Sequence, residues 1–494
     1  MGFWKEDGTP GGMVNPQQMP PPAQYPPQAQ QQVQQPAQQH AVPQPGQQSA
    51  QQPLQQQVFI PTPAFAPQSG TNVPSFEERF NQLMKNAVRS PAIDLAIQIS
   101  DLILEQAIIE RASDVHLEYQ GKSLRVRFRI DGTLQDIANI TSDEKLPISQ
   151  RIRVLAGFDP ESATKFRMEE GRFQKIIGGR VIQVRVSTFP TVNGEKLVLR
   201  ILDRTQMGLD LNQLGLTQED MDTLIRVAHN PYGIFYTTGS TGAGKTTTLY
   251  AMLRQRNTPM VNIITLEDPV EYRLEGINQA QINPKTGFGW REGLLTILRQ
   301  DPDIVMVGEI RDHESAEITM RAALTGHLIF TTMHTISAPG VVERLFEMGT
   351  PHFLIASSLL GSLSQRLVKK LCPHCAQPAE PPSEKAVAEF VEGLDPVEAE
   401  EIKKIVTRQG AQFKVEKGCP ACRNTGYLGR TALFEIMIMN EELRKAVLAH
   451  APTDELKRTA VKSGMKTLLM DGIYKASCGL TTLNEVLRVT ATMS

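Results

Sequence analysis

The chain has 494 residues and a formal net charge of −2, which leaves room for about three domains and argues against a polyanion as the main partner. No apolar run approaches the ~18 residues of a membrane span, and residues 1–6 lack the apolar core of a signal peptide. We therefore expect a cytosolic protein whose five cysteines are reduced. Any association with a membrane would be peripheral, through a partner.

The first 73 residues have a composition of their own. From about Gln17 to Gln57 the sequence is almost entirely Gln, Pro and Ala. Such a segment cannot bury enough apolar surface to offset the entropy of the chain, so we predict a disordered tail over 1–73. The composition favours a plain spacer over a tether or docking tail.

Residues 74–204 have the pattern of a small α+β domain. Apolar residues at helical spacing predict a helix from about Ile93 to Arg111, followed by a turn at Ser113 and Asp114. Two further helices are expected at about 75–80 and 148–157. Alternating apolar and polar residues predict half-buried strands at 115–119, 124–130, 172–177, 180–188 and 195–202.

The stretch 205–215 has the character of an interdomain linker, and 216–371 that of a parallel α/β domain. Thr217 and Asp220 form a capping pattern that opens a helix, and Asn230-Pro231 closes it. Beyond this helix apolar strands alternate with helices, as expected of a parallel sheet. The candidate strands are 233–236, 261–266, 304–307 and 328–331.

The first of these strands leads into a glycine-rich turn and then into a helix, the arrangement of the P-loop pattern G-x-x-x-x-G-K-[ST]. Backbone N–H groups of such a loop and the N-terminus of the following helix bind phosphate oxygens. Lys245 would reach the β- and γ-phosphates, and the hydroxyl of Thr246 would bind Mg²⁺. The sequence therefore predicts a nucleoside triphosphate site. Its residues are Gly239, Ser240, Thr241, Gly242, Ala243, Gly244, Lys245, Thr246 and Thr247.

Two further apolar strands end in carboxylates, one in Glu267 and the other in Glu309. At the carboxyl ends of parallel strands beside a P-loop, these side chains would lie near the phosphates and Mg²⁺. We predict that Glu267 orients the attacking water and that Glu309 acts on Mg²⁺ through a coordinated water. A solvated acidic loop is the alternative for Glu267. His327 and His334 flank the last strand, where γ-phosphate sensing and a structural hydrogen-bonding role have equal weight.

Two Cys-x-x-Cys pairs follow, Cys372 with Cys375 and Cys419 with Cys422. Four thiolates suit a closed tetrahedral Zn²⁺ site, which in the cytosol is structural. The alternatives are a redox pair and unrelated buried thiols, and His374 could replace Cys375 as a ligand.

We assign 372–438 to a zinc-binding subdomain with a helical insertion at about 384–409, and 439–494 to a C-terminal helical region. The fifth cysteine, Cys478, has no partner in sequence and is expected to be a buried small residue. The C-terminal helices are expected to have caps at Asn440, Thr453 and Thr482.

From about residue 93 to 494 the chain resembles the hexameric ATPases of type II secretion and type IV pilus assembly. Besides the P-loop, the resemblance rests on the acidic segment 267–271, the Walker B segment 307–312 and the histidine segment 324–335. Further matching stretches are 113–118, 185–188, 194–196, 198–202, 298–303 and 480–489.

The resemblance implies an α/β protein with a PAS-like α+β N-terminal domain, then a RecA-like P-loop ATPase domain with a tetracysteine zinc insertion. It implies a homohexamer that binds ATP and Mg²⁺ at its subunit boundaries, with Arg185 and Arg200 reaching the nucleotide from the N-terminal domain. Hydrolysis would act on an inner-membrane platform protein that adds pilin to a type IV pilus or a type II secretion pseudopilus. A tetracysteine motif is typical of assembly motors, whereas retraction motors usually lack it.

Two features depart from this family's pattern. Leu295 stands where relatives usually carry an arginine, which affects one charge contact at the subunit boundary. The folded extra N-terminal domain that is common in assembly motors is replaced by the Gln/Pro tail, so recruitment to the membrane machinery would use a different contact.

Other functions are weighed against the assembly motor. A DNA-uptake or DNA-transfer motor of the same superfamily is poorly separated by sequence. A zinc-bearing nucleic-acid-binding protein predicts a basic, aromatic-rich face near the cysteines, whereas 380–401 is rich in acid, so no direct nucleic-acid partner is expected. A non-hydrolysing scaffold conflicts with the presence of Glu267 and Glu309. The leading interpretation is a mechanical ATPase for pilus or pseudopilus assembly.

Overall fold

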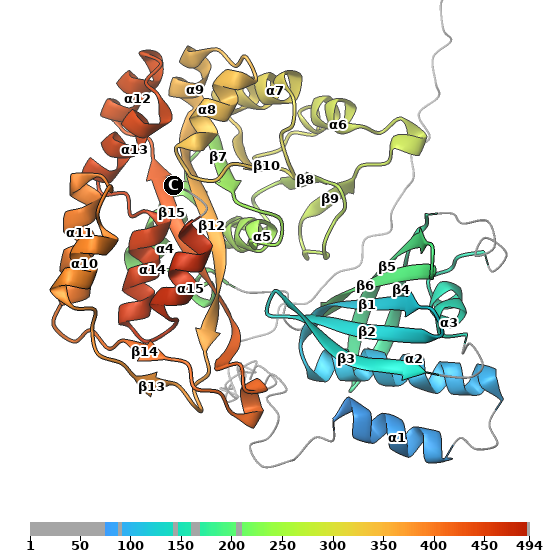
Figure 1. Ribbon diagram of the computed structural model, residues 1–494. Coiled ribbons are helices and arrows are strands. Elements are labelled where there is room, and N and C mark those ends of the chain that lie inside the picture. The colour runs from blue at the N-terminus through green and yellow to red at the C-terminus, as the bar shows by residue number, and fades with distance from the viewer. Residues whose placement is uncertain (1–74, 87–90, 142–146, 160–167, 204–209, 492–494) are drawn as a thin grey trace, which may run out of the picture. The chain divides into compact units, whose positions relative to one another are not determined.

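Figure 1 shows a computed structural model of the chain, which describes residues 75–86, 91–141, 147–159, 168–203 and 210–491. One large sheet lies within 75–203, here called the N-terminal region, and another within 210–491, the P-loop region. The predicted tail, 1–73, and the first part of the predicted linker lie outside the described residues.

The N-terminal region is built on a six-stranded sheet in the order β3-β2-β1-β6-β5-β4, with antiparallel neighbours throughout. Inward-facing residues of the strands and the apolar side of α2 share one buried core, because the strands alternate as predicted. The strands are β1 (Ala112–Gln120), β2 (Ser123–Ile130), β3 (Thr133–Thr141), β4 (Glu170–Ile177), β5 (Arg180–Thr191) and β6 (Gly194–Asp203). The helices are α1 (Phe76–Asn86), α2 (Ala92–Ile109) and α3 (Ile148–Leu155).

The predicted helices and strands of this region are confirmed, but two details differ. The turn predicted at Ser113 and Asp114 is wrong, because both residues lie in β1 and Asp114 pairs with β2 and β6. β3 is missing from the predicted strands, since a register shift between Val126 and Arg127 interrupts its pairing and only one of its residues is buried. A mostly exposed strand lacks the alternation on which the prediction depends.

The P-loop region is built on a seven-stranded sheet in the order β15-β12-β7-β11-β10-β8-β9. All neighbouring pairs are parallel except the one between β12 and the edge strand β15, so the predicted parallel α/β sheet is confirmed. Its strands are β7 (Gly233–Thr238), β8 (Ile263–Glu267), β9 (Asn278–Gln281), β10 (Ile304–Val307), β11 (Leu328–Met333), β12 (Leu359–Leu371) and β15 (Tyr427–Ile438).

Helices cover both faces of this sheet. Successive residues of β7 enter different apolar clusters, Ile234 and Tyr236 one cluster and Phe235 the other, as expected of strands buried on both faces. Thr217 caps the first helix as predicted, with its side chain accepting a hydrogen bond from the N–H of Asp220 at 3.2 Å. The helices are α4 (Gln218–Ala228), α5 (Lys245–Arg256), α6 (Trp290–Ile297), α7 (His313–Leu324), α8 (Gly340–Glu347) and α9 (His352–Ser358).

The segment beyond β12 contains a helical insertion and returns to the main sheet. Within the segment assigned to a zinc subdomain, 372–438, the last residues form β15 and pair with β12 in the main sheet. The helical insertion is confirmed as α10 (Glu384–Phe390) and α11 (Pro396–Thr407), beside the short pair β13 (Gln377–Pro378) and β14 (Lys414–Val415). The remaining helices are α12 (Glu441–Leu448), α13 (Thr453–Lys462), α14 (Leu468–Ser477) and α15 (Leu483–Thr490).

Two of the three helix caps predicted in the C-terminal region are confirmed. Asn440 caps α12 and Thr482 caps α15, each accepting a hydrogen bond from a backbone N–H. The cap predicted at Thr453 is wrong, because α13 already begins there and its hydroxyl donates to Glu343 at 2.5 Å. A further threonine, Thr467, caps the next helix, α14, and was not predicted.

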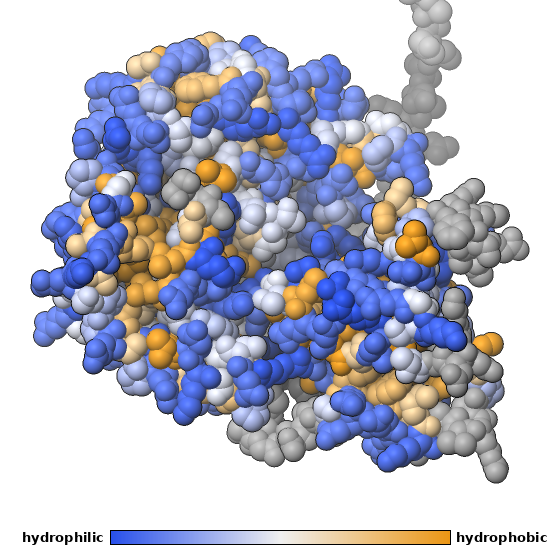
Figure 2. All heavy atoms as spheres, in the orientation of Figure 1, coloured by the Kyte–Doolittle hydropathy of each residue, from blue (hydrophilic) through white to orange (hydrophobic). Residues whose placement is uncertain are grey.

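The C-terminal helices cover one side of the sheet. On the face shown in Figure 2, hydrophilic residues predominate and hydrophobic ones gather where Figure 1 places α14, α15 and β15. Large hydrophobic side chains exposed on or beside these elements include Ile438, Tyr474 and Leu480. Within the described ranges, no helix has both the length and the apolar character needed to cross a membrane.

Candidate nucleotide site and cysteine cluster

The P-loop joins the carboxyl end of β7 to the first turn of α5. Gly239 and Gly244 have φ of 143° and 92°, and residues with a side chain rarely adopt such angles. A Cβ on Gly239 would lie 2.5 Å from the carbonyl oxygen of Gln365, and one on Gly244 would lie 2.8 Å from its Nε2. Both glycines are therefore required by backbone conformation and by the close approach of β12. Because α5 begins at Lys245, its free N–H groups face the loop.

Lys245 has only backbone carbonyls as hydrogen-bond acceptors in the described part of the chain. Its Nζ donates to the carbonyl oxygens of Gly239 at 2.8 Å and Ser240 at 3.2 Å. Burial and the charge of Arg366 lower the pKa of Lys245 to about 8, against the opposing effect of Glu309. A bound phosphate would favour the charged ammonium and reverse this shift.

Gln365 of β12 packs against the P-loop, although it lies outside the P-loop motif. It is 2% exposed, and its Oε1 accepts a hydrogen bond from the hydroxyl of Thr248 in α5 at 2.6 Å. A buried polar side chain needs a partner. No sequence signal distinguished Gln365 from the other polar residues of β12, such as Ser362 and Ser364.

Glu309 follows β10 and lies close to the P-loop. Its carboxylate pairs with Arg311, and its Oε2 lies 3.8 Å from Nε2 of His334. A cavity of about 460 Å³ is lined by Glu309, Arg311 and His334, among others. The carboxylate can therefore meet a ligand that enters this cavity.

His334, which follows β11, belongs to the same site. The next residue, Thr335, donates its N–H to the hydroxyl oxygen of Thr238 in β7 at 2.7 Å, which fixes the segment beside the loop. Burial, with the charge of Lys245 as a second cause, lowers the pKa of His334, so its imidazole is neutral at pH 7. A neutral imidazole can donate one hydrogen bond to a phosphate oxygen.

His327 lies at the opposite end of β11. Its carbonyl oxygen accepts a hydrogen bond from the N–H of Gly233, and its Nδ1 lies 3.0 Å from the carbonyl oxygen of Ala322. The strand between the two histidines spans about 20 Å. The structure therefore brings His334, and not His327, to the P-loop.

Glu267 ends β8 and is 2% exposed. Its Oε1 accepts hydrogen bonds from the hydroxyl of Thr265 at 2.6 Å and from Nε2 of Gln279 at 3.1 Å, and its Oε2 accepts one from the hydroxyl of Tyr250. Burial raises the pKa of Glu267, and these hydrogen bonds oppose that rise. Glu267 is thus held inside the protein, unlike Glu309. No sequence signal distinguished Tyr250 from other aromatic residues of the core.

The two predicted arginines lie together in the N-terminal region. Arg185 of β5 is the cross-strand partner of Arg200 of β6. On β1, Asp114 pairs with Arg200, with 3.1 Å between Nε and Oδ1, and Arg129 of β2 lies 3.7 Å from the same carboxylate. The row continues to Arg172 of β4, the cross-strand partner of Arg185, so four arginines and Asp114 lie across five strands. Arg185 also pairs with Glu271, with 3.1 Å between Nη2 and Oε2.

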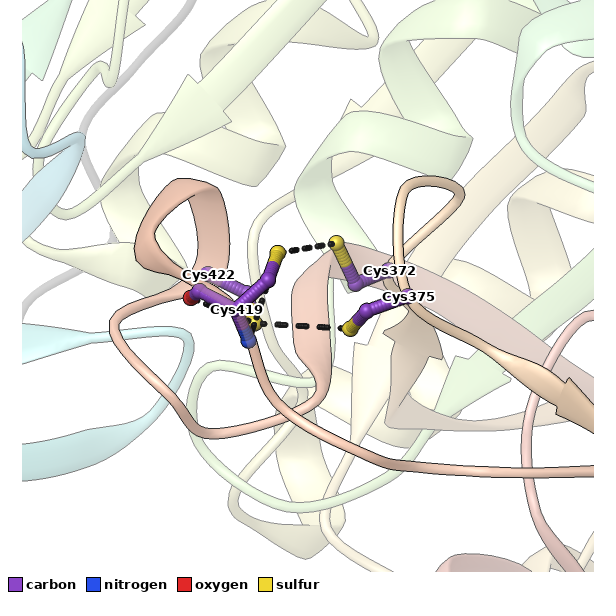
Figure 3. Close-up of side chains that lie close together, drawn as sticks. All are labelled: Cys372, Cys375, Cys419 and Cys422. Atoms are coloured by element: carbon purple, nitrogen blue, oxygen red, sulfur yellow. Dashed lines mark hydrogen bonds between the residues drawn. The ribbon is translucent and has the colours of Figure 1, made fainter.

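The four cysteines of the two pairs meet in one cluster (Figure 3). Cys372 and Cys375 follow β12, and Cys419 and Cys422 precede β15, so pairing of these two strands brings them together. The Sγ atoms lie 3.8 Å apart for Cys372 and Cys419, 3.8 Å for Cys375 and Cys422, and 3.7 Å for Cys419 and Cys422.

These separations fit a zinc ion. Tetrahedral coordination at Zn–S bonds of about 2.3 Å requires sulfurs about 3.8 Å apart. Burial raises the pKa of Cys422, but backbone N–H groups of Cys419 and Gly426, each 3.2 Å from its Sγ, outweigh this effect and lower the pKa to about 7. The donor set is therefore suited to a metal, and it is completed by Cys375 rather than His374.

The prediction that Cys478 is buried is wrong. The side chain is exposed, and its Sγ accepts a hydrogen bond from the guanidinium of Arg408 at 3.0 Å. Cys478 is the C-cap residue of α14, which ends at the surface.

Comparison with known proteins identifies the family. The family model described as type II/IV secretion system protein matches residues 92–488. The putative type II secretion system protein E of Escherichia coli (strain K12) is 44% identical over 395 residues, covering 80% of this chain and 76% of that protein. The type IV pilus assembly ATPase PilB of Myxococcus xanthus (strain DK1622) is 41% identical over 416 residues, covering 84% and 70%. The chain belongs to the type II/IV secretion system protein family.

Solved structures share the fold. The ATPase DotB of Yersinia pseudotuberculosis has a TM-score of 0.60 at 20% sequence identity, covering 82% of this chain and 96% of that one. The pilus retraction motor PilT with bound ADP has a TM-score of 0.54 at 23% identity, covering 78% and 96%. The chain therefore has the fold of these ATPases.

Proposed function

We propose that the chain is a motor ATPase that drives assembly of a type IV pilus or of a type II secretion pseudopilus. The family match over 92–488 carries this proposal. The relatives, at 41–44% identity, include type II secretion system proteins E and a pilus assembly ATPase. Those names favour secretion and pilus assembly over DNA uptake.

ATP would occupy the P-loop, with the loop 239–247 and the N-terminus of α5 around its phosphates. Lys245 would exchange its two carbonyl partners for phosphate oxygens. The hydroxyl of Thr246 would hold Mg²⁺, which supplies charge neutralisation of the phosphates when bound.

Hydrolysis would take place on the side of the loop where Glu309 and His334 lie. The accessible carboxylate of Glu309 would act on the Mg²⁺-bound water, and His334 would contact the γ-phosphate. Glu267 remains the predicted base, but accepting a proton from water would require release of a hydrogen bond, such as that from Tyr250. His327 would act in another part of the protein.

The arginine row would serve the same nucleotide in a homohexamer. In this proposal the N-terminal region is the PAS-like domain, and Arg185 and Arg200 reach ATP at a subunit boundary. An arginine delivered to the γ-phosphate stabilises charge in the transition state by factors of roughly 10³–10⁵. Arg200→Ala should therefore lower kcat steeply at an unchanged melting temperature, while Arg125→Ala, on β2 in an ion pair with Asp136, should not. Equal turnover in both variants, with rings still formed, would exclude this role.

Zinc would hold the ends of β12 and β15 together through Cys372, Cys375, Cys419 and Cys422. The sulfur separations support this assignment. Such a closed four-thiolate site supplies folding free energy rather than catalysis.

The motor would work at the cytoplasmic face of the inner membrane through a platform protein. The test is genetic and biochemical. In a strain that lacks this gene, the parent chain should restore surface pili or secretion, and Lys245→Ala should not, at equal protein levels. The purified parent should hydrolyse ATP as a hexamer in analytical ultracentrifugation. A parent chain that hydrolyses ATP but restores DNA uptake alone would contradict the assembly function.

A further inference from the structure

Arg366, the residue after Gln365 on β12, lies against the first glycine of the P-loop. Its Nη1 lies 3.1 Å from the position that a Cβ on Gly239 would take. The same Nη1 makes a long hydrogen bond of 3.3 Å to the carbonyl oxygen of Gln365. The guanidinium therefore reaches the loop although Arg366 is 121 positions further along the chain than Lys245.

The charge of Arg366 has no direct carboxylate partner. Its side chain is half-buried, and none of the ion pairs within 4.0 Å in the described ranges includes it. Burial lowers the pKa of Arg366, and the more distant Glu435 opposes this effect. A desolvated cation without a counter-ion is costly. Arg366 and Lys245 together therefore make the loop a site that an anion would stabilise.

The sheet order places Arg366 on a defined side of the loop. β12 is the neighbour of β7 on one side, whereas β11 and β10, which precede His334 and Glu309, lie on the other. If those two residues face the γ-phosphate, a side chain from β12 reaches the nucleotide from the opposite side. The phosphates on that side are present in both ATP and ADP.

We propose that Arg366 binds the α- or β-phosphate of the nucleotide at the P-loop. This inference rests on the proposed ATPase function, since it requires a nucleotide at that loop. The planar guanidinium can bind two phosphate oxygens at once, which suits this position. Arg366 is a nucleotide-binding residue that holds substrate and product alike, in contrast to Glu309.

The test compares binding of ADP and of ATP to the full-length chain by isothermal titration calorimetry with Mg²⁺. Arg366→Ala should weaken both affinities by about 10-fold or more, because hydrogen bonds between charged groups are lost. Arg366→Lys should recover part of the loss, since it keeps the charge but not the planar fork. Lys370→Ala removes an exposed cation from the same strand and should bind both nucleotides like the parent.

A structural role is separated by melting curves. Arg366→Ala should melt at the parent temperature without nucleotide and show a smaller rise on addition of ADP. If Arg366→Ala does not fold, Arg366→Gln keeps much of the side-chain length without the charge and should show the same loss for both nucleotides.

Unchanged affinities in a folded Arg366→Ala or Arg366→Gln variant would overturn the role of Arg366. They would leave the proposed function intact, provided that the parent binds ADP and Lys245→Ala does not. A loss for ATP without a loss for ADP would also overturn the role of Arg366, because the contact would then be with the γ-phosphate. A parent chain that binds neither nucleotide would contradict both the inference and the proposed function.

Discussion

The P-loop and the cysteine cluster are both suited to charged ligands, yet they are assembled in opposite ways. The P-loop takes most of its groups from one continuous stretch, 239–247, whereas the cluster joins two pairs that are 47 residues apart. At the P-loop, the half-buried cations Lys245 and Arg366 would be stabilised by an anion. In the cluster, four closely spaced sulfurs offer the donor set of a metal cation.

This difference predicts where damage will appear. Loss of a P-loop residue should affect ligand binding and chemistry, because strand and helix form around the loop without the ligand. Loss of a cysteine should loosen the ends of β12 and β15, because these ends are far apart in sequence and a metal cross-link between them would stabilise the fold. The following experiments test that contrast.

Lys245→Ala should have the largest effect. Nucleotide binding should weaken by about 100-fold and hydrolysis should become undetectable, because the phosphates lose their point cation. The melting temperature without nucleotide should stay close to that of the parent, since the lysine is desolvated and bound only to carbonyls. Calorimetric titration and scanning calorimetry measure both effects. Hydrolysis at the parent rate would exclude the P-loop as the site.

Glu309→Gln should come next. Turnover should fall by about 10²–10³, while the affinity for ATP changes little, because the amide keeps the shape but loses the charge that acts on the bound water. Steady-state hydrolysis and ATP titration separate the two effects. Glu343→Gln, which alters another carboxylate of the same cavity, is the control and should hydrolyse ATP normally. Equal losses in both variants would assign the effect to the charge of the cavity.

Cys419→Ser should show the opposite pattern. The parent should contain one zinc per chain by elemental analysis, and the variant none, with a melting temperature lower by at least about 5 °C. Its affinity for ADP should match the parent. Cys478→Ser, at the exposed cysteine outside the cluster, should keep both zinc and stability. A parent without zinc, with all five thiols alkylated in the native state, would rule out the metal site.

The lowered pKa of Lys245 predicts a pH dependence of nucleotide binding. In the free protein this pKa is about 8, and a bound phosphate raises it. Affinity for ADP should therefore be constant below pH 8 and fall as the pH rises through and above it, because binding then requires uptake of a proton. Titrations in buffers of different ionisation enthalpy detect that proton. An affinity that stays constant to pH 9.5 would contradict the pKa assignment.

Tyr250→Phe should have the smallest effect. Its hydroxyl donates to Glu267 and thereby lowers the pKa of that carboxyl, so its removal should raise this pKa. If Glu267 is the base, the acidic limb of the profile of kcat against pH should move to higher pH, with KM nearly unchanged. Tyr272→Phe, at the ring packed edge-on against Tyr250, tests whether packing alone moves the profile. An identical profile for Tyr250→Phe and the parent would remove Glu267 from proton transfer.

The sequence alone determined the local features of the protein. The P-loop, its flanking strand and its helix are recognisable because glycine conformation and the helix N-terminus act within about ten residues. The alternating strands 115–119 and 124–130 are likewise patterns of neighbouring residues, and they recur as β1 and β2. The cysteine spacing predicted the cluster, since each Cys-x-x-Cys pair is itself local.

Only the tertiary structure decided the features that join distant residues. Gln365 and Tyr250 became part of the site through strand order and burial, which no motif near them encodes. The strand from Tyr427 to Ile438 belongs to the main sheet because of its pairing with β12, a contact across the whole cysteine segment. In the sequence, His327 and His334 are equally good candidates because each adjoins the same strand. In the structure they lie at opposite ends of β11, and only the end with His334 meets the P-loop. Periodicity gives the direction in which a side chain points, whereas packing decides what it meets.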